Sequence, residues 1–321
     1  MVHNSSKSLA NYAAFAFVAI IWGTTWVAIK ISLQGYPPFA GAMFRFLFAI
    51  AMLILYARMT RISLALPRDT MRWIIVTAIL LYVIDYGLIY WGEQYLNAGV
   101  TAILFAALPL ATTLMSAFVF KSEPFRYRQL VGICFGLGGI VVVFFDQLVI
   151  TDFNANVILA AIAIVVAAIA AALNVVIAKR HLMIVDALPL AVHQMIWGSL
   201  GLGIIAALTG EFRNVHYSVD ATTALLYLGL AGSAVAFVMY YSLLKTMSAS
   251  ALSTITYFTP LVAVFSGWLL LKESISMRVG VGAFAIFIGI AIIQFDDLIV
   301  IARRSLRLPL SKVPVQTESP A

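Results

Sequence analysis

The sequence has one cysteine among 321 residues, four histidines and only 10% charged residues. The single cysteine, Cys134, excludes an intrachain disulfide. So little charge, together with 63% hydrophobic residues and a mean hydropathy of +1.04, excludes a water-soluble chain. There is also no H-E-x-x-H or G-x-S-x-G motif and no cluster of histidines and carboxylates, so we expect no metal site and no cofactor, and an enzyme is disfavoured.

What the chain contains instead is ten apolar runs, each long enough to cross a bilayer as a helix of about 20 residues. An all-α membrane protein is therefore expected. Ten spans place both termini on the same side of the membrane. The predicted helices cover residues 12–33, 38–57, 70–92, 97–119, 127–145, 156–178, 187–209, 220–244, 249–271 and 277–295.

The net charge of +7 would suggest nucleic acid as a partner of a soluble protein, but here the basic residues lie in loops between apolar runs. When the loops are sorted by side, fifteen of the 20 Lys and Arg residues fall on one side and four on the other, with Arg45 inside a span. Because basic loops stay in the cytoplasm, the sequence predicts cytoplasmic tails at 1–11 and 297–321 in a bacterial inner membrane protein, with no nucleic-acid partner.

An internal repeat appears when the chain is aligned with itself at an offset of 151 residues, and then 150 after a one-residue gap. The halves are predicted as 12–145 and 156–296, joined by a periplasmic linker at 146–155. An odd number of spans per half makes the two copies insert with opposite orientation, as in many transporters. The matched pairs are Tyr90 and Tyr241, Ala98 and Ala249, Pro109 and Pro260, Lys121 and Lys272, Glu123 and Glu273, Gly132 and Gly282, and Gly139 and Gly289.

The two segments "AGVTAILFAALPLATTLMSAFVFKSEPFRYRQLVGICFGLGGIVVV" and "SASALSTITYFTPLVAVFSGWLLLKESISMRVGVGAFAIFIGIAII" resemble the EamA-like branch of the drug/metabolite transporter superfamily. "IWGTTWVAIK" is similar to that family's Trp-Gly opening, and Arg45 occupies the place of its second-helix arginine. The resemblance implies a ten-helix basket that exports metabolites through a central cavity, and within the family the chain looks most like bacterial amino acid exporters. A drug or other metabolite exporter, or a channel, is the alternative.

Side chains that could line a transport path occur on several helices. Tyr82, Tyr86 and Tyr90 recur every fourth residue and so share one face, and packing between helices is the alternative interpretation. Their counterparts in the second half are Ser233, Phe237 and Tyr241. The remaining candidates are Phe105 and Thr256, each about one turn before a proline, and Trp22, Thr25 and Asn174.

Prolines and buried charges are the other candidates. Pro109 and Pro260 each free a backbone carbonyl near the middle of a helix, which predicts a hinge or a ligand site, with a harmless kink as the alternative. Arg45 and Asp85 lie at similar depths, so the hypothesis is an ion pair in one conformation. His193 and Glu93 are candidates for a proton relay, against structural roles in packing or capping.

Glycines on the fifth and tenth predicted helices, Gly132, Gly136, Gly139, Gly282 and Gly289, permit close approach of helices. Packing within the chain is the expected use of these glycines, and a homodimer is the alternative. We therefore expect a monomer in the lipid bilayer whose partner is a small-molecule substrate.

Overall fold

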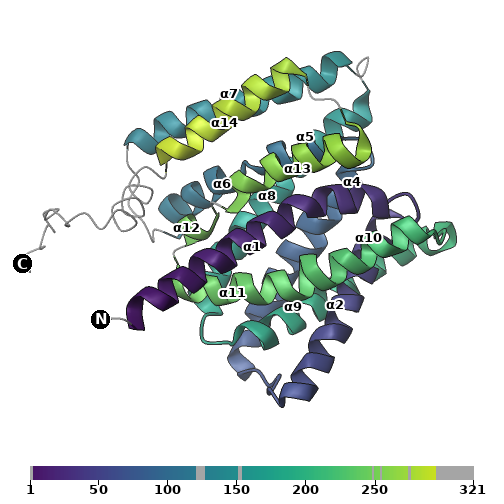
Figure 1. Ribbon diagram of the computed structural model, residues 1–321, viewed down its shortest axis with the longest axis vertical. Coiled ribbons are helices and arrows are strands. Elements are labelled where there is room, and N and C mark those ends of the chain that lie inside the picture. Colours follow the sequence, from purple (N-terminus) through teal and green to yellow (C-terminus); the bar gives the residue numbers. More distant parts are fainter. Residues whose placement is uncertain are drawn as a thin grey trace, which may run out of the picture.

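The computed structural model describes residues 3–120, 127–150, 154–247, 249–253, 255–273 and 276–293. Over these residues every regular element is helical, and the helices form one bundle (Figure 1). The predicted tail at 297–321 and part of the predicted linker at 146–155 lie outside the described residues. The prediction of an all-helical chain is confirmed for the part that the structure describes.

The elements follow the predicted apolar runs closely. Some runs are continuous helices, and others are divided by short 3₁₀ or π-helical segments. In chain order they are α1 (His3–Ser32), α2 (Pro38–Thr60), η1 (Arg68–Thr70), α3 (Met71–Ala78), η2 (Ile79–Tyr86), α4 (Gly87–Gly92), α5 (Ala98–Phe105), α6 (Leu108–Leu114), η3 (Met115–Val119), α7 (Tyr127–Ile150), α8 (Ala155–His181), α9 (Ala187–Leu208), η4 (Glu211–Asn214), α10 (Val219–Gly229), η5 (Leu230–Val235), α11 (Ala236–Thr246), α12 (Ala249–Ser253), α13 (Ile255–Leu271) and α14 (Met277–Ile293).

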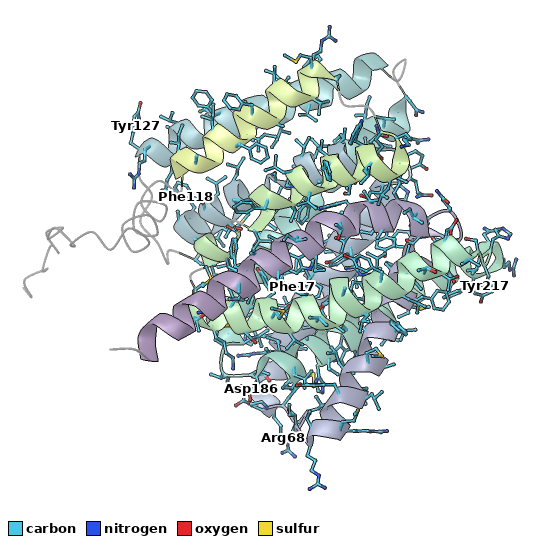
Figure 2. The ribbon with its side chains drawn as sticks, in the orientation of Figure 1. Phe17, Arg68, Phe118, Tyr127, Asp186 and Tyr217 are labelled. Carbon is cyan, nitrogen blue, oxygen red and sulfur yellow. The ribbon has the colours of Figure 1, made fainter. Side chains whose placement is uncertain are left out.

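Seven helical segments of the described chain are long and apolar enough to cross a membrane. Three shorter apolar helices, Tyr127–Val143, Phe258–Leu271 and Met277–Gly289, lie where the remaining predicted runs were placed. The outer surface carries apolar side chains, including the exposed Phe17 on α1 and Phe118 on η3 (Figure 2). Such a surface is stable only against hydrocarbon, which fits a multi-pass membrane protein.

Two predicted boundaries were wrong by more than a turn. The first helix begins at His3 rather than residue 12, because nothing between His3 and Asn11 is a proline or glycine that would stop it. The fifth helix, α7, continues to Ile150, past the predicted end at 145. Elsewhere capping residues mark the starts: Asn154 accepts a hydrogen bond from the backbone N–H of Asn156 at 3.0 Å, and Ser218 accepts one from Ala221 at 3.2 Å.

Two π-helical segments occupy equivalent positions in the two halves. The segment η2 begins at Ile79 and η5 begins at Leu230, which is the 151-residue offset of the sequence repeat. A π-helical turn is wider than an α-helical turn, so it rotates the side chains that follow and leaves carbonyl groups free of their usual partners. The segment η2 lines the cavity described below, and η5 directly precedes α11, which also lines it.

The interior packs small residues against large ones. The central helix α8 is alanine-rich, and its alanines from Ala160 to Ala172 are mostly buried, so its neighbours approach closely. The helices α7 and α14 pack along one another at one side of the bundle (Figure 1). There a Cβ on Gly139 would strike the carbonyl oxygen of Gly282, and a Cβ on Gly289 would strike that of Gly132. These glycines therefore pack within the chain.

Candidate functional site

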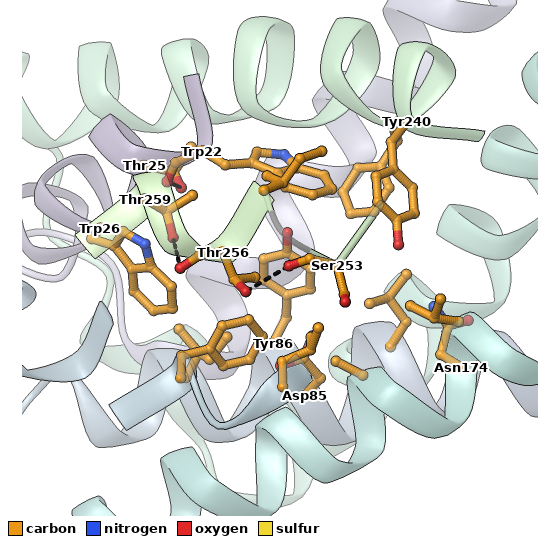
Figure 3. Close-up of a pocket in the computed structure, with 18 of the residues that line it drawn as sticks. Trp22, Thr25, Trp26, Asp85, Tyr86, Asn174, Tyr240, Ser253, Thr256 and Thr259 are labelled. Carbon is orange, nitrogen blue, oxygen red and sulfur yellow. Dashed lines mark hydrogen bonds between the residues drawn. The ribbon is translucent and has the colours of Figure 1, made fainter. Parts of the chain in front are cut away.

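A cavity lies in the middle of the bundle, enclosed by helices from both halves of the chain (Figure 3). The space open to the centres of water-sized spheres is about 80 Å³, which is room for about six waters. Its lining residues are Trp22, Thr25, Trp26 and Ile29 of α1; Leu81, Asp85 and Tyr86 of η2; Ile89 of α4; Phe105 of α5; Leu108 of α6; Ala171, Asn174 and Val175 of α8; Phe237 and Tyr240 of α11; Leu252 and Ser253 of α12; and Ile255, Thr256 and Thr259 of α13.

Six of the twenty lining residues are aromatic. Trp22 packs against Phe237 and Tyr240 with ring centroids 5.4 and 5.0 Å apart, and Trp26 packs against Phe105 at 5.4 Å. Phe237 and Tyr240 come from the second half of the chain and the other three from the first. The two halves therefore build a single aromatic surface around the cavity.

Seven of the predicted candidates lie on this wall. They are Trp22, Thr25, Tyr86, Phe105, Asn174, Phe237 and Thr256. The sequence analysis missed Trp26, Tyr240 and Thr259, although each was within reach of a simple signal. Trp26 lies one turn after Trp22 on the same helix face, and Thr259 lies one turn after Thr256.

Four other candidates do not reach the cavity, and the prediction that they line it is corrected here. Tyr82, Tyr90, Ser233 and Tyr241 are each fully buried behind the wall. Tyr82 and Tyr86 do share one side of the π-helical η2, since their rings stack with centroids 6.1 Å apart, but only Tyr86 reaches the cavity. Tyr82 instead packs edge-on against Phe46 at 4.7 Å.

Tyr241 belongs to a polar network behind the cavity. Its hydroxyl donates to Gln194 Oε1, and Gln194 Nε2 donates to Thr77 Oγ1 at 2.6 Å. All three side chains are buried. Because each buried polar atom of this chain of bonds needs its partner, the network fixes α9 against α3 and α11.

Arg45 is not bonded to Asp85. It is completely buried; its Nε donates to Ser233 Oγ at 2.7 Å and its Nη2 donates to the Gly232 carbonyl oxygen at 3.2 Å. The guanidinium also lies 4.7 Å from the ring centroid of Tyr86. This conformation has no Arg45–Asp85 ion pair, because the π-helical η5 offers Arg45 a hydroxyl and a carbonyl; a pair in another conformation stays a prediction.

Asp85 and Asn174 present buried polar atoms to the cavity wall without partners. Asp85 is 2% exposed and Asn174 is 1% exposed. Neither Asp85 Oδ1 nor Asn174 Oδ1 accepts a hydrogen bond within the described residues, and Trp26 Nε1 likewise finds no acceptor there. Unpartnered buried groups are uncommon and costly, so the three on this wall make the cavity a candidate binding site.

The two proline candidates differ in their surroundings. Pro109 is the second residue of α6, directly after the break at Ala106 and Ala107 that ends α5. Pro260 lies inside α13, which continues through it. Only Pro109 coincides with an interruption among the described residues, and neither proline lines the cavity.

His193 and Glu93 lie away from the cavity wall. His193 Nδ1 is 2.9 Å from the Pro189 carbonyl oxygen on its own helix. Glu93 is fully buried at the end of α4, close to Lys30, whose Nζ donates to the carbonyl oxygens of Glu93 and Leu96 at 2.5 and 2.7 Å. The geometry gives Glu93 a place in a closed helix end and no route to the cavity.

A matching lysine closes the corresponding helix in the second half. Lys179 Nζ donates to the carbonyl oxygens of Leu244 and Met247 at the end of α11, the latter at 2.7 Å. Leu244 and Met247 are the residues 151 positions after Glu93 and Leu96. The two lysines lie at opposite ends of the bundle. The end of α1, which carries Lys30, is tied to the start of α10 by a backbone hydrogen bond from His216 to Gly35. Lys179 instead contacts the end of α11, which is the far end of the helical run that α10 begins.

Glu273 joins the two halves at the Lys30 end. Its Oε1 accepts from the backbone N–H of Ala98 at 2.9 Å, and its Oε2 accepts from Gly99 at 3.3 Å. A carboxylate here satisfies free N–H groups at the start of α5 and faces the positive end of the dipole of that helix. This contact holds the segment after α13 against the first half.

Comparison with known proteins gives a consistent family. The chain is 26% identical over 273 residues to the uncharacterized transporter YoaV of Bacillus subtilis, covering 85% of this chain and 92% of that protein. It is 28% identical to the protein PagO of Salmonella typhimurium, covering 78% and 81%, and 28% identical to the uncharacterized inner membrane transporter YedA of Escherichia coli, covering 87% and 90%.

A solved crystal structure shares the fold with a TM-score of 0.64 at 19% identity, covering 91% of this chain and 98% of that one. The model of the EamA-like transporter family matches the chain twice, over residues 10–145 and 158–295. Both matches together cover nearly the whole membrane region. The chain belongs to the EamA-like transporter family.

Proposed function

We propose that this transporter exports small metabolites, foremost neutral and aromatic amino acids, by alternating access through the central cavity. The observation that carries the proposal is the cavity itself, an aromatic wall built by both halves of the chain with unpartnered polar atoms at Asp85 and Asn174. Aromatic faces suit apolar and aromatic side chains, and the few polar atoms suit the charged end of an amino acid.

The cavity volume supports a change of conformation during transport. Ligand cavities usually measure about 300–1,000 Å³, so a cavity of about 80 Å³ must widen to load an aromatic amino acid. Side-chain hydrogen bonds close the bundle at two opposite helix ends, from Lys30 and to Glu273 at one end and from Lys179 at the other. Each end would open when its bonds break. Equivalent closures at opposite ends are what two states of similar energy require.

Orientation and assembly form part of the same proposal. Ten spans in two inverted halves, both termini in the cytoplasm of a bacterium, and a monomer in the inner membrane are supported by the basic loops and by the internal packing of the glycines. Reporter fusions after residues 120, 153 and 321 would test the orientation. A periplasmic signal from a fusion at residue 321 contradicts it.

The function is tested by uptake of radiolabelled Phe, Trp, Met, Thr and Lys into liposomes that contain the purified protein, with and without a pH gradient. Saturable uptake of Phe or Trp above empty liposomes is expected, with mutual competition among neutral amino acids. The alternative cargo is a drug or another metabolite carried by the same fold. Absence of uptake for all five amino acids favours that alternative and overturns the amino acid proposal.

A further inference from the structure

Asp85 is a buried acidic residue whose environment favours binding of a cation. It lies on η2 with its side chain on the cavity wall, 2% exposed, and its Oδ1 has no hydrogen-bond partner among the described residues. A carboxylate inside a membrane protein is costly unless a partner neutralises it. An ionisable residue in this position is by default part of a functional site.

No side chain of the described protein supplies that partner. Arg45 makes no ion pair with Asp85: its Nε and Nη2 are held by Ser233 and the Gly232 carbonyl, and its Nη1 has no partner among the described residues. Lys30 contacts the carbonyl oxygens of Glu93 and Leu96 at the end of α4. Within the described residues no ion pair therefore satisfies Asp85, and its place on the cavity wall gives a cation from outside the chain access to it.

The other polar atoms on the wall are also mostly acceptors. Thr25 donates its hydroxyl hydrogen to the Trp22 carbonyl at 2.6 Å, and Thr256 donates to that of Ser253 at 2.7 Å. Because these hydroxyl hydrogens are already used, the two hydroxyl oxygens can act toward a ligand only as acceptors. Asn174 Oδ1 is unpartnered on α8, which packs against η2. A wall rich in acceptors selects a ligand that is rich in donors.

Aromatic rings complete the surroundings of such a donor. Trp22, Tyr86 and Tyr240 line the same cavity, with Tyr240 directing its hydroxyl into it (Figure 3). Ring faces attract an ammonium group, and the attraction is strongest where water is excluded. Trp26 Nε1, a buried donor without a partner among the described residues, suits the opposite, negatively charged end of the same ligand.

We propose that Asp85 binds the protonated amino group of the cargo, with Asn174 as a second acceptor, so that this transporter selects molecules that carry a primary ammonium group. The inference rests on the proposed function, because it assumes that the central cavity is the transport site. It adds the chemical group that the cargo must present and the residue that recognises it.

The test is competition for binding of radiolabelled Phe to the purified protein in detergent. Phenethylamine keeps the ammonium and lacks the carboxylate, and 3-phenylpropionate has the opposite pattern. In the unmodified protein phenethylamine is expected to compete at least ten-fold better. In Asp85→Asn, Phe binding weakens at least ten-fold and the preference for the amine disappears, because a neutral amide cannot form a charge-assisted bond.

Two further variants separate recognition from folding. Asp85→Glu keeps the charge and is expected to retain the preference for phenethylamine. Asp186→Asn changes an exposed aspartate that pairs with Lys245 at 2.8 Å outside the cavity, and should leave all three affinities unchanged. Without ligand, Asp85→Asn should unfold at an equal or higher temperature than the unmodified protein, because it removes an unpartnered buried charge.

The outcomes distinguish this inference from the proposed function. Equal competition by the amine and the acid, or an amine preference that survives in Asp85→Asn, overturns the role of Asp85 and leaves the amino acid proposal standing. If Phe does not bind, radiolabelled phenethylamine is measured directly; its binding, lost in Asp85→Asn, supports the role of Asp85 and overturns the amino acid cargo. Binding of none of the three compounds overturns both.

Discussion

Arg45 donates a 2.7 Å hydrogen bond from Nε to the hydroxyl oxygen of Ser233, so a cation of the second predicted span is held by the second half of the chain. Ser233, in the π-helical η5, in turn donates to the carbonyl oxygen of Leu228, five residues earlier in α10. The neighbouring Gly232 carbonyl accepts from both Arg45 and Trp22, each at 3.2 Å. One irregular turn therefore anchors a buried charge and a cavity residue together.

Removing this anchor should destabilise the protein. Ser233→Ala leaves the Arg45 Nε without its partner, and loss of a buried hydrogen bond to a charged group costs about 1.5–3 kcal/mol. The free energy of unfolding in detergent measures the effect. Ser242→Ala is the matched control, because this serine lies on α11 and is exposed, bonded only to the Val238 carbonyl of its own helix. Equal stability of the two variants would contradict the anchoring role.

Weakening the contact of Glu273 should open the bundle at the Lys30 end. Glu273→Gln loses the attraction between a carboxylate and the start of α5, about 0.5–1 kcal/mol, which changes the population of an open state two- to five-fold. The readout is the labelling rate of Thr256→Cys by an impermeant maleimide, in a Cys134→Ser background, from the face on which Glu273 lies. The rate should rise two- to five-fold.

The control for that experiment is Glu211→Gln. Glu211 also accepts from a backbone N–H at the start of a helix, Ala40 at 2.8 Å, but it does not contact α5. An equal increase in labelling for Glu211→Gln would show that loss of any helix-capping carboxylate loosens the bundle. It would contradict a specific role of Glu273 in closing the Lys30 end.

The opposite end should respond in the opposite direction. Lys179→Met removes the bonds to the carbonyl oxygens of Leu244 and Met247, so opening at the α11 end becomes easier. Labelling of the same cysteine reporter should increase from that face and decrease from the other. Lys245→Met changes an exposed lysine at the same end, paired with Asp186, and should leave both rates unchanged. Parallel increases from both faces would contradict alternating access.

The packing of α7 against α14 predicts a sharp contrast between two adjacent glycines. A Cβ on Gly139 would strike the backbone of Gly282, whereas a Cβ on Gly138 meets nothing within 4 Å. Gly139→Ala should therefore lower the unfolding free energy by about 1–3 kcal/mol. Gly138→Ala should be neutral or stabilise by up to about 1 kcal/mol through helix propensity. Thermal unfolding in detergent distinguishes them, and equal effects would mean that the two helices separate freely.

Loss of Gln194 should expose the cost of the polar network behind the cavity. Gln194→Leu leaves the hydroxyl of Tyr241 without its acceptor inside the bundle, and an unsatisfied buried donor costs about 1–3 kcal/mol. Adding Tyr241→Phe to Gln194→Leu also removes the unpaired donor, so the double variant should lose less stability than the two single variants together. Double-mutant analysis of unfolding free energies measures the coupling, and additive effects would contradict a direct bond.

The helices were predictable because the thickness of a bilayer sets their length and the loops concentrate the charges. Seven cavity residues were predictable because aromatic and hydroxyl side chains are conspicuous in otherwise aliphatic spans. The π-helical segments were not, since no proline or charge marks Ile79 or Leu230 as the start of a wider turn.

Other features of the site depend on packing that the sequence does not show. Tyr82 stacks on Tyr86 as a shared helix face predicts, but Tyr82 and Tyr90 are fully buried and do not line the cavity. Arg45 was expected to pair with Asp85 in one conformation because both are charged and equally deep. The carbonyl that attracts Arg45 instead is exposed by backbone geometry at Gly232, and a sequence pattern does not reveal which carbonyls a helix leaves free.

The two halves have the same order of helices but differ in the side chain at the position of Asp85. By the repeat offset, Tyr86 corresponds to Phe237, and Asp85 corresponds to Ala236. A mirror-like cavity with matched walls would accept a ligand in two reversed poses of equal energy. Because Ala236 is buried and does not line the cavity, the carboxylate of Asp85 has no counterpart on the second half, and a ligand bound to it would keep its heading relative to the first half while the two ends of the bundle open in turn. The direction in which a molecule faces would thus survive the whole transport cycle, and mutations in either wall could change selectivity without disturbing the other.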